Sequence, residues 1–223
     1  MITQSPKKIY IVGSNPNDFF DLTIEAIDIL SKSNIIICSK KFHVHYKKIF
    51  DKSNKKVLFE EDLANSKMVL LKVIHKLFET YDTISHLISG DPFLFFENKE
   101  EFFFQKKKIP VEKILGIPEI IIWMNKKKMF LTNRNKNSSV SFFYPKTKSD
   151  CNKLLNIKNF EKLIIKISIE SVLQNIKEIF LKKLDKKIKY KFFVNAKEIK
   201  FSSSLKLDKS ASDVYIILEN AKL

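Results

Sequence analysis

Glycine and arginine are almost absent from this chain, whose 223 residues include three glycines and one arginine, Arg134. A protein selected to grip phosphate groups would be expected to use the bidentate guanidinium fork more often. Phosphate recognition is therefore a poor explanation for the positive charge of the chain. Where glycine is so scarce, each one that remains is expected where the backbone turns sharply or approaches something closely.

Cysteine, proline and long apolar runs are also scarce. Cys38 and Cys151 lie far apart and match no metal-binding spacing, and two cysteines are too few for a disulfide framework. No run of 18 apolar residues occurs, and the polar, basic residues 1–8 are not followed by the apolar stretch of a signal peptide. We therefore expect a cytoplasmic protein with no membrane partner. A hydrophobic content of 44% excludes disorder and allows one large domain or two small ones.

The charge of the chain has two possible origins. Lysine and arginine number 41 against 25 acidic residues, which gives a formal net charge of +16. Abundant Lys, Asn, Ile and Phe beside scarce Gly, Arg, Ala and Trp are typical of drift in an extremely A/T-rich genome. The alternative is a polyanionic partner, either a nucleic acid or a substrate that carries many carboxylates.

Strand and helix patterns alternate along the chain, beginning with strands at 8–12 and 35–38 around a helix at 21–32. This alternation predicts an α/β fold with a largely parallel sheet in each of two successive halves, and a softer boundary at 126–137. Further strands are predicted at 83–88, 110–115, 141–144, 163–167, 190–194, 200–207 and 214–218, and further helices at 68–78, 97–107, 119–125, 151–157 and 171–184.

All three glycines fall in turns that contain proline and follow β-favouring apolar runs. The turns are residues 13–18, 89–92 and 115–118. Glycine accepts positive φ and has no Cβ to hold a ligand away, and ligands of open α/β sheets lie beyond the carboxyl ends of strands. The turns are therefore candidates for contacts with a small molecule.

Four ordered segments make the chain resemble the tetrapyrrole methylase family, and most closely its S-adenosylmethionine-dependent uroporphyrinogen III C-methyltransferases. Residues 13–18, GSNPND, are similar to the family pattern G-x-G-P-G-D, and residues 89–101, SGDPFLFFENKEE, to G-G-D-P-F-x-F-G-R-G-G-E-E. Residues 109–117, IPVEKILGI, are similar to I-P-x-x-V-x-P-G-I, and residues 130–134, FLTNR, to P-L-T-H-R. The resemblance extends over almost the whole chain.

The resemblance implies the two-domain tetrapyrrole methylase fold, with α/β domains at 1–130 and 131–223 and S-adenosylmethionine in the cleft between them. It also implies a tetrapyrrole substrate and a homodimer. Many of the cofactor contacts would be made by the backbone, although Ser89, Ala196 and the pair Pro118 and Glu119 depart from the small residues of the family. Carried over position by position, the cofactor-binding residues are Pro16, Ser89, Gly90, Asp91, Leu94, Pro118, Glu119, Ile167 and Ala196.

The acid/base residues of the family have no match here. The family has an aspartate after its second strand and a lysine in a later G-K-R, and the corresponding positions hold Ser39 and Glu61. The basic residue that usually precedes the second glycine turn is Ile88. We therefore predict no catalytic residue.

Three functions from different classes remain open. The first is C-methylation of uroporphyrinogen III to precorrin-2 in sirohaem or cobalamin synthesis, with another tetrapyrrole as a variant. The second is a degraded relative that binds cofactor or a partner without turnover, which the changes at Ser39 and Glu61 favour. The third is a nucleic-acid binder or RNA methylase, against which the intact turn at 90–93 argues.

Histidine, phenylalanine and lysine groups give weaker signals. A strand would place His43 and His45 on one face, but a third ligand is not evident and no metal is expected. Lysines at 106–108 and 126–128 are typical of solvated faces. The phenylalanines could stack on a flat macrocycle, although core packing is the commoner outcome; they are Phe93, Phe95, Phe96, Phe102, Phe103 and Phe104.

Overall fold

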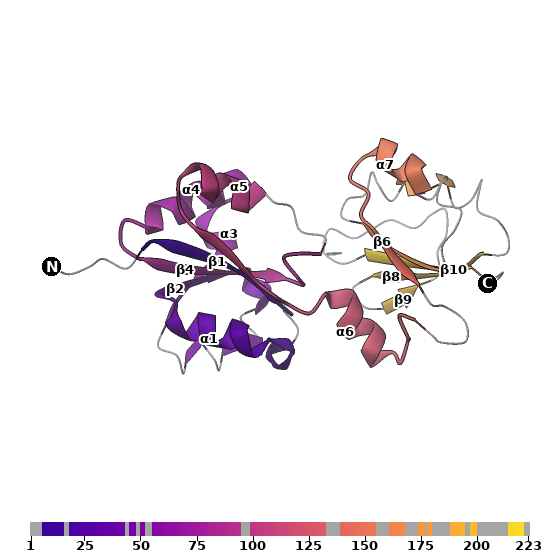
Figure 1. The fold of residues 1–223 in the computed structure, drawn as a ribbon, viewed down its shortest axis with the longest axis horizontal. Coiled ribbons are helices and arrows are strands. Elements are labelled where there is room, and N and C mark those ends of the chain that lie inside the picture. The colour runs from indigo at the N-terminus through magenta and orange to yellow at the C-terminus, as the bar shows by residue number, and fades with distance from the viewer. Residues whose placement is uncertain are drawn as a thin grey trace. The chain divides into compact units, whose positions relative to one another are not determined.

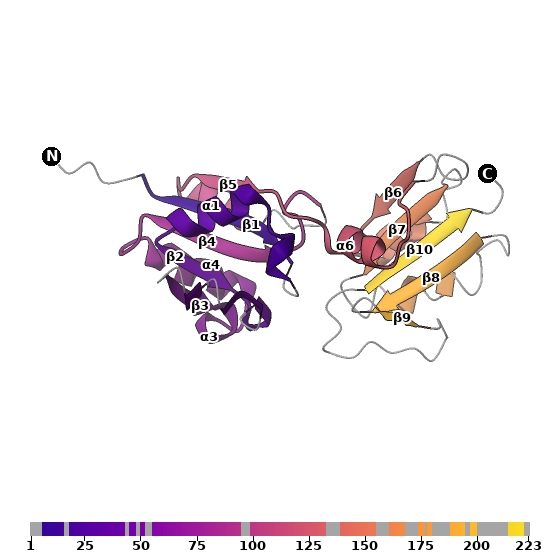
Figure 2. The ribbon, with the colours of Figure 1, turned by 90° about the horizontal axis from the view of Figure 1, so that it is seen from below.

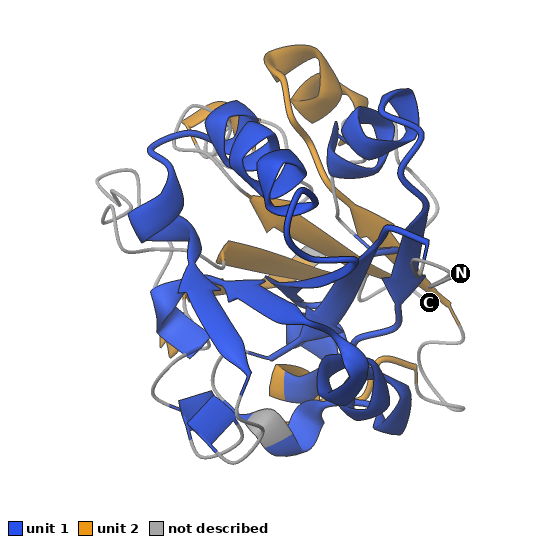
Figure 3. Ribbon diagram, turned by 90° about the vertical axis from the view of Figure 1, so that its left-hand side faces the viewer, with its two compact units in different colours: residues 1–122 blue, residues 123–223 orange. Residues whose placement is uncertain are grey.

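The structure is a computed structural model, which describes residues 6–15, 18–42, 45–47, 50–51, 55–94, 99–132, 139–154, 161–167, 174–176, 178–179, 188–194, 197–199 and 214–220. Two compact units are formed by residues 1–122 and 123–223 (Figure 3). Each unit contains its own five-stranded sheet. The domain boundary expected at residue 130 stays a prediction.

The sheet of the first unit is entirely parallel, in the order β3-β2-β4-β1-β5. Its central strands are buried and mostly apolar, as expected for strands that helices cover on both faces. Because all strands run the same way, their carboxyl ends lie along one edge. The strands are β1 (Lys8–Ser14), β2 (Ile35–Cys38), β3 (Lys56–Phe59), β4 (Thr83–Ser89) and β5 (Val111–Ile114).

Helices cover both faces of this sheet (Figure 1). Helix α1 (Ile24–Lys32) packs Ala26 and Leu30 on one face, and its first turn is capped by the side chain of Thr23. Helices α4 (Lys67–Leu77) and α5 (Lys99–Lys106) pack Ile74 and Phe104 on the other face. Short helices also occur at η1 (Phe19–Asp21), η2 (Lys40–Phe42) and α3 (Glu60–Leu63).

The second sheet has the order β6-β7-β10-β8-β9 (Figure 2) and is mainly antiparallel. The prediction of a largely parallel sheet is therefore wrong for this half. Strands β6 and β7 are parallel, but β8 and β9 are too close in sequence for anything except an antiparallel pair, and β10 runs opposite to both of its neighbours. The strands are β6 (Val140–Phe143), β7 (Lys162–Ile167), β8 (Ile188–Val194), β9 (Lys197–Ile199) and β10 (Val214–Asn220).

Two of the helices whose bounds the structure describes contact the second sheet. Helix α7 (Lys148–Lys153) buries Cys151 in the core of this unit and begins with a capping box between Thr147 and Asp150. Helix α6 (Glu119–Lys126) begins in the first unit and ends in the second, where Trp123 packs on Phe193 with ring centroids 4.0 Å apart. None of the helices in the described ranges is long and apolar enough to cross a membrane.

The predicted mixture of helices and strands is confirmed, but some elements differ. Strands β3 and β9 are not predicted by the sequence patterns, since each has only three or four residues and lacks a long apolar run. The residues described at 45–47 are helical, so the strand reading of the His43 and His45 pair is wrong, and His43 itself lies outside the described residues. The strand predicted at 200–207 also lies outside them.

Candidate functional site

The three glycines of the chain meet at the carboxyl edge of the first sheet, where β1, β4 and β5 are neighbours. A Cβ on Gly13 would lie 2.6 Å from the backbone nitrogen of Gly116 and 2.6 Å from the carbonyl oxygen of Gly90. A Cβ on Gly116 would come closer still to the same carbonyl oxygen. What Gly13 and Gly116 approach is therefore the backbone of the neighbouring turns, which leaves no room for a side chain.

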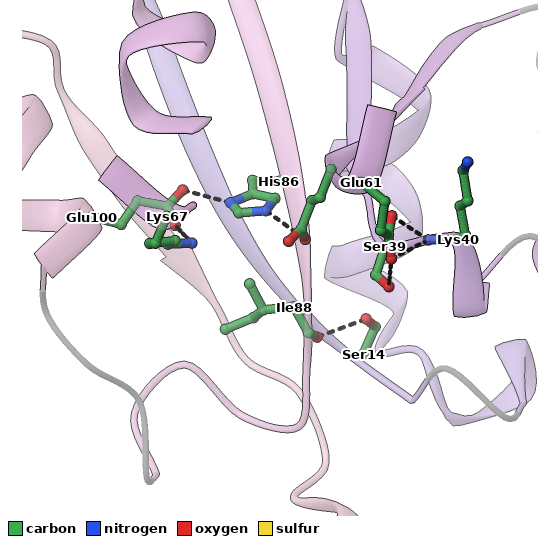
Figure 4. Close-up of polar contacts among 9 residues, drawn as sticks. Ser14, Ser39, Lys40, Glu61, Lys67, His86, Ile88 and Glu100 are labelled. Carbon is green, nitrogen blue, oxygen red and sulfur yellow. Dashed lines mark hydrogen bonds and ion pairs between the residues drawn. The ribbon is translucent and has the colours of Figure 1, made fainter. Parts of the chain in front are cut away.

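Hydrogen bonds hold two of these turns together. The Gly90 backbone N–H donates to the Ser14 carbonyl at 2.7 Å, and the Ser14 hydroxyl donates to the Ile88 carbonyl at 2.8 Å (Figure 4). Asp91 then stabilises its own turn, because its Oδ1 accepts from the Phe93 N–H at 2.7 Å. The turn that carries the predicted cofactor contacts is thus held by one backbone hydrogen bond and by the side chains of Ser14 and Asp91.

Gly90 has an open side. Its φ of +81° lies in the region that favours glycine, and the nearest atom to a Cβ built there is the Glu119 backbone nitrogen at 3.9 Å. The Ser89 hydroxyl beside it is shielded from solvent and has no hydrogen-bond partner in the part of the chain that the structure describes. An open cradle next to a buried, unsatisfied hydroxyl is the surrounding that a polar small molecule would complete.

The first unit therefore brings together the two predicted loops, with Gly90 facing the start of α6. Ile167 lies in the second unit at the end of β7, and its 1% exposed side chain belongs to the core, so only its backbone could meet a ligand. Pro16 and Ala196 lie outside the described residues. The predicted residues in the first unit are Ser89, Gly90, Asp91, Leu94, Pro118 and Glu119.

Ser39 and Glu61, which occupy the acid/base positions of the family, are in contact. Ser39 follows β2 and Glu61 follows β3, at the same edge of the sheet. The Ser39 hydroxyl donates to Glu61 Oε1 at 2.5 Å, and the Lys40 N–H donates to Glu61 Oε2 at 2.9 Å (Figure 4). Burial alone would raise the pKa of Glu61, but these hydrogen bonds outweigh it and the pKa is lowered. The pair presents an ionised acceptor near neutral pH.

A buried charged cluster, made up of Glu60, Lys67, His86 and Glu100, lies on the face of the sheet that α4 and α5 cover. The side chains of His86 and Glu100 are 0% exposed. His86 Nδ1 lies 2.6 Å from Glu100 Oε1 and His86 Nε2 lies 3.0 Å from Glu60 Oε1, while Lys67 Nζ donates to Glu100 Oε2 at 2.7 Å (Figure 4). Two fully buried charged groups, His86 and Glu100, thus meet two partly exposed ones, Glu60 and Lys67.

Charge pairing decides the protonation of this cluster. Burial alone would lower the pKa of His86, but the charge of Glu100 and hydrogen bonds to Glu100 and Glu60 raise it to about 9. Burial alone would raise the pKa of Glu100, but the charge and hydrogen bond of His86, with Lys67, lower it to about 2. His86 is therefore an imidazolium at neutral pH.

The sequence carries a signal for this cluster that the family motifs and glycine turns do not include. His86 interrupts the apolar run of β4, and Glu100 occupies a position in α5 that the helix buries. An ionisable residue at a buried position requires a partner, so each of the two residues predicts the other.

Glu60 reaches the surface at an open pocket of about 240 Å³. Its side chain is 30% exposed, so the cluster connects the buried imidazolium with solvent. The pocket is lined by Glu60, Glu61, Ala64, Asn65, Ser66, Lys67 and Leu70. Among the described residues, no group of three or more His, Cys, Asp or Glu could hold a metal ion.

Solved structures share this fold. Uroporphyrin-III C-methyltransferase from Thermus thermophilus matches with a TM-score of 0.68 at 15% identity, over 96% of this chain and 93% of that one. Its complex with S-adenosyl homocysteine matches with a TM-score of 0.67 at 15% identity, over 96% and 98%. Cobalt precorrin-4 methyltransferase matches with a TM-score of 0.66 at 13% identity, over 96% of this chain and 95% of that one. Precorrin-6Y methylase from Archaeoglobus fulgidus matches with a TM-score of 0.60 at 15% identity, over 97% of this chain and 99% of that one.

Sequence comparison identifies the family. No curated protein matches the chain. The family profile of the tetrapyrrole (corrin/porphyrin) methylases, however, matches residues 8–189, which include both sheets up to the start of β8. This match covers well over half of the chain and agrees with the shared fold of the solved structures. The chain belongs to the tetrapyrrole (corrin/porphyrin) methylase family.

Proposed function

We propose that this protein uses S-adenosylmethionine to methylate carbon atoms of uroporphyrinogen III, which gives precorrin-2 for sirohaem or cobalamin synthesis. The observation that carries the proposal is the turn at Ser89, Gly90 and Asp91, whose open side faces the start of α6 at the carboxyl edge of a parallel sheet. The solved complex of a family member with S-adenosyl homocysteine supports the choice of cofactor. We also propose a cytoplasmic homodimer.

The residues present fit this cofactor. When bound, S-adenosylmethionine supplies a methyl group on a sulfonium sulfur. The Ser89 hydroxyl would gain the hydrogen-bond partner that it lacks among the described residues, and Gly90 would allow close approach because it carries no Cβ. Holding the donor and the pyrrole carbon in line accounts for much of the acceleration in such a transfer. The turn is rigid because Ser14 and Asp91 fix it, which suits this positioning role.

A second candidate is methylation of another tetrapyrrole. Cobalt precorrin-4 methyltransferase matches with nearly the same TM-score as the uroporphyrin enzyme, so the fold does not favour one ring over another. The contact between Ser39 and Glu61 also differs from the aspartate and lysine implied by the resemblance. A relative that binds cofactor without turnover remains the alternative to both.

The test is transfer of labelled methyl groups from S-adenosylmethionine to anaerobically prepared uroporphyrinogen III, with binding of S-adenosyl homocysteine titrated in parallel. A dimethylated product supports the first proposal. Cofactor binding without transfer supports another tetrapyrrole or a degraded relative, and the same assay with precorrin substrates separates these two. Absence of cofactor binding would overturn the methyltransferase proposal.

Asp91→Ala locates the cofactor site. Loss of the Asp91 carboxylate frees the Phe93 N–H and loosens the turn, so we expect at least tenfold weaker binding of S-adenosyl homocysteine. Asp82→Ala is the matched control, because Asp82 lies before the opposite end of the same strand. Equal affinities for the two variants would place the cofactor elsewhere.

A further inference from the structure

Contacts within the cluster of Glu60, Lys67, His86 and Glu100 lead from a fully buried carboxylate, through the His86 ring, to a carboxylate that reaches solvent. Glu100 is fully buried, its Oε2 accepts from Lys67 and its Oε1 faces His86 Nδ1. The other ring nitrogen of His86, Nε2, lies 3.0 Å from Glu60 Oε1. Glu60 is the only member of the cluster that both contacts His86 and lines the pocket. The imidazolium thus presents its second N–H to the carboxylate at the surface.

Glu60 is better placed than Glu61 to accept a proton. Both oxygens of Glu61 accept hydrogen bonds, from the Ser39 hydroxyl and the Lys40 N–H. Glu60 uses Oε1 for His86, and its Oε2 has no hydrogen-bond partner within the described ranges. Glu60 directly follows β3, so its backbone lies at the carboxyl edge of the sheet, and β2 separates β3 from β4, the nearest strand that ends in a glycine turn.

We propose that Glu60 accepts the proton which the methylated pyrrole releases, and that His86 is a positioning residue that orients Glu60. This inference rests on the function proposed above. Addition of a methyl group leaves a positive charge on the ring. Loss of a ring proton to Glu60 Oε2 returns the electron pair of the broken bond to the ring and converts the carboxylate to a carboxylic acid, so charge and atoms balance.

The charges around His86 fit this role. Within the part of the chain that the structure describes, the titratable groups that face it are Glu60 from α3, Lys67 from α4 and Glu100 from α5. Lys67 shares Glu100 with His86, and the second ring nitrogen of His86 lies 3.0 Å from Glu60 Oε1. This contact orients the Glu60 carboxylate.

The first experiment is steady-state methyl transfer by Glu60→Gln. Loss of the proton acceptor should lower kcat by at least tenfold while the affinity for S-adenosyl homocysteine stays within twofold of wild type. Glu60→Asp should recover part of the loss. Glu79→Gln is the matched control, because Glu79 is exposed in the turn after α4. A full kcat in Glu60→Gln would overturn the inference.

The second experiment is the pH profile of kcat in His86→Gln. Because His86 loses its proton as the pH rises through about 9, kcat of the wild-type protein should fall along an alkaline limb that His86→Gln lacks. His75→Gln is the histidine control, since His75 packs against the Phe103 ring and lies outside the cluster. A lower kcat with an unchanged alkaline limb would show that His86 is only structural and would overturn its role.

A third measurement does not depend on turnover. Titration of the His86 ring nitrogens by NMR should show that the imidazolium loses its proton at a pH about one unit lower in Glu60→Gln than in wild type. An unchanged titration would overturn the coupling even where His86→Gln fails to fold. If the wild-type protein transfers no methyl group to uroporphyrinogen III, the proposed function fails and this inference fails with it. Transfer by wild type with full activity in Glu60→Gln overturns this inference alone.

Discussion

The glycines have two different structural reasons, close backbone approach at Gly13 and Gly116 and a positive φ at Gly90, and the difference can be measured. Gly13→Ala would place a methyl group 2.6 Å from two backbone atoms, so strands or turns must move, at a cost of about 3 kcal/mol. Gly90→Ala meets no atom nearer than 3.9 Å and pays only for its positive φ, about 1 kcal/mol. Urea denaturation should rank the two variants in this order. Equal costs would contradict the three-way contact of the turns.

Protonation of His86 should make stability depend on pH. The pKa of His86 is about 9 in the folded protein, against about 6.5 in an unfolded chain, so the folded protein binds more protons between these values. Its contribution is complete below about pH 6.5 and is lost as the pH rises through 9. The free energy of unfolding should therefore fall by about 3 kcal/mol between pH 6 and 9.5.

The contribution of Glu100 to stability depends on pH in the opposite direction from that of His86. The pKa of Glu100 is lower in the folded protein, so its contribution is present above about pH 4.5 and is lost as the pH falls toward 2. Urea denaturation across the pH range would measure both effects. His86→Gln should flatten the alkaline limb and His75→Gln should leave it. An alkaline limb that survives in His86→Gln would exclude His86 as its cause.

The sequence predicts the parts of the candidate site that depend on backbone turns. It does not predict the parts that depend on contacts between side chains far apart in the sequence. The turns at Gly90 and Pro118 are predictable because glycine and proline constrain φ in ways that a sequence displays. The cluster around His86 is indicated only by ionisable residues at buried positions, and its full membership is not predictable, because its members are up to 40 positions apart and only the packing of three helices brings them together. The meeting of Ser39 with Glu61 likewise depends on β3, which the sequence patterns do not predict.

The helix that most clearly depends on a single side chain is α7, which has only six residues. The Thr147 hydroxyl accepts from the Asp150 N–H at 3.1 Å, while the Asp150 carboxylate accepts from the Thr147 N–H at 3.1 Å. Thr147→Ala should therefore cost about 1 kcal/mol in urea denaturation, whereas Thr147→Ser, which keeps the hydroxyl, should cost little. The same loss in both variants would mean that the methyl group, not the cap, is responsible.

The direction of strands is an element-scale property that local patterns do not contain. Alternation of helix and strand correctly indicates the parallel order around β1, because crossover helices require it. In the second unit, β10 enters between β7 and β8 and pairs with both in the antiparallel sense. The residues of a strand have the same apolar character in either direction, so only the path of the chain decides.

At the scale of the whole molecule, the net charge of +16 has two possible origins, compositional drift or attraction of a polyanionic partner. The salt dependence of activity distinguishes them. If the charge attracts a substrate with many carboxylates, kcat/KM for uroporphyrinogen III should fall about tenfold between low and physiological ionic strength, because steering is screened. The affinity for S-adenosyl homocysteine, which carries no large negative charge, serves as the internal control. A flat kcat/KM would favour compositional drift as the origin of the lysines.

The chain contains one tryptophan, and its location makes the protein a natural optical reporter. Trp123 is 7% exposed and contacts the ring of Phe193, four residues after the glutamate whose backbone nitrogen faces Gly90. All indole fluorescence therefore comes from one turn of α6 beyond the proposed cofactor loop. We expect the emission wavelength and intensity to report ligand binding at that loop without labels or engineered probes.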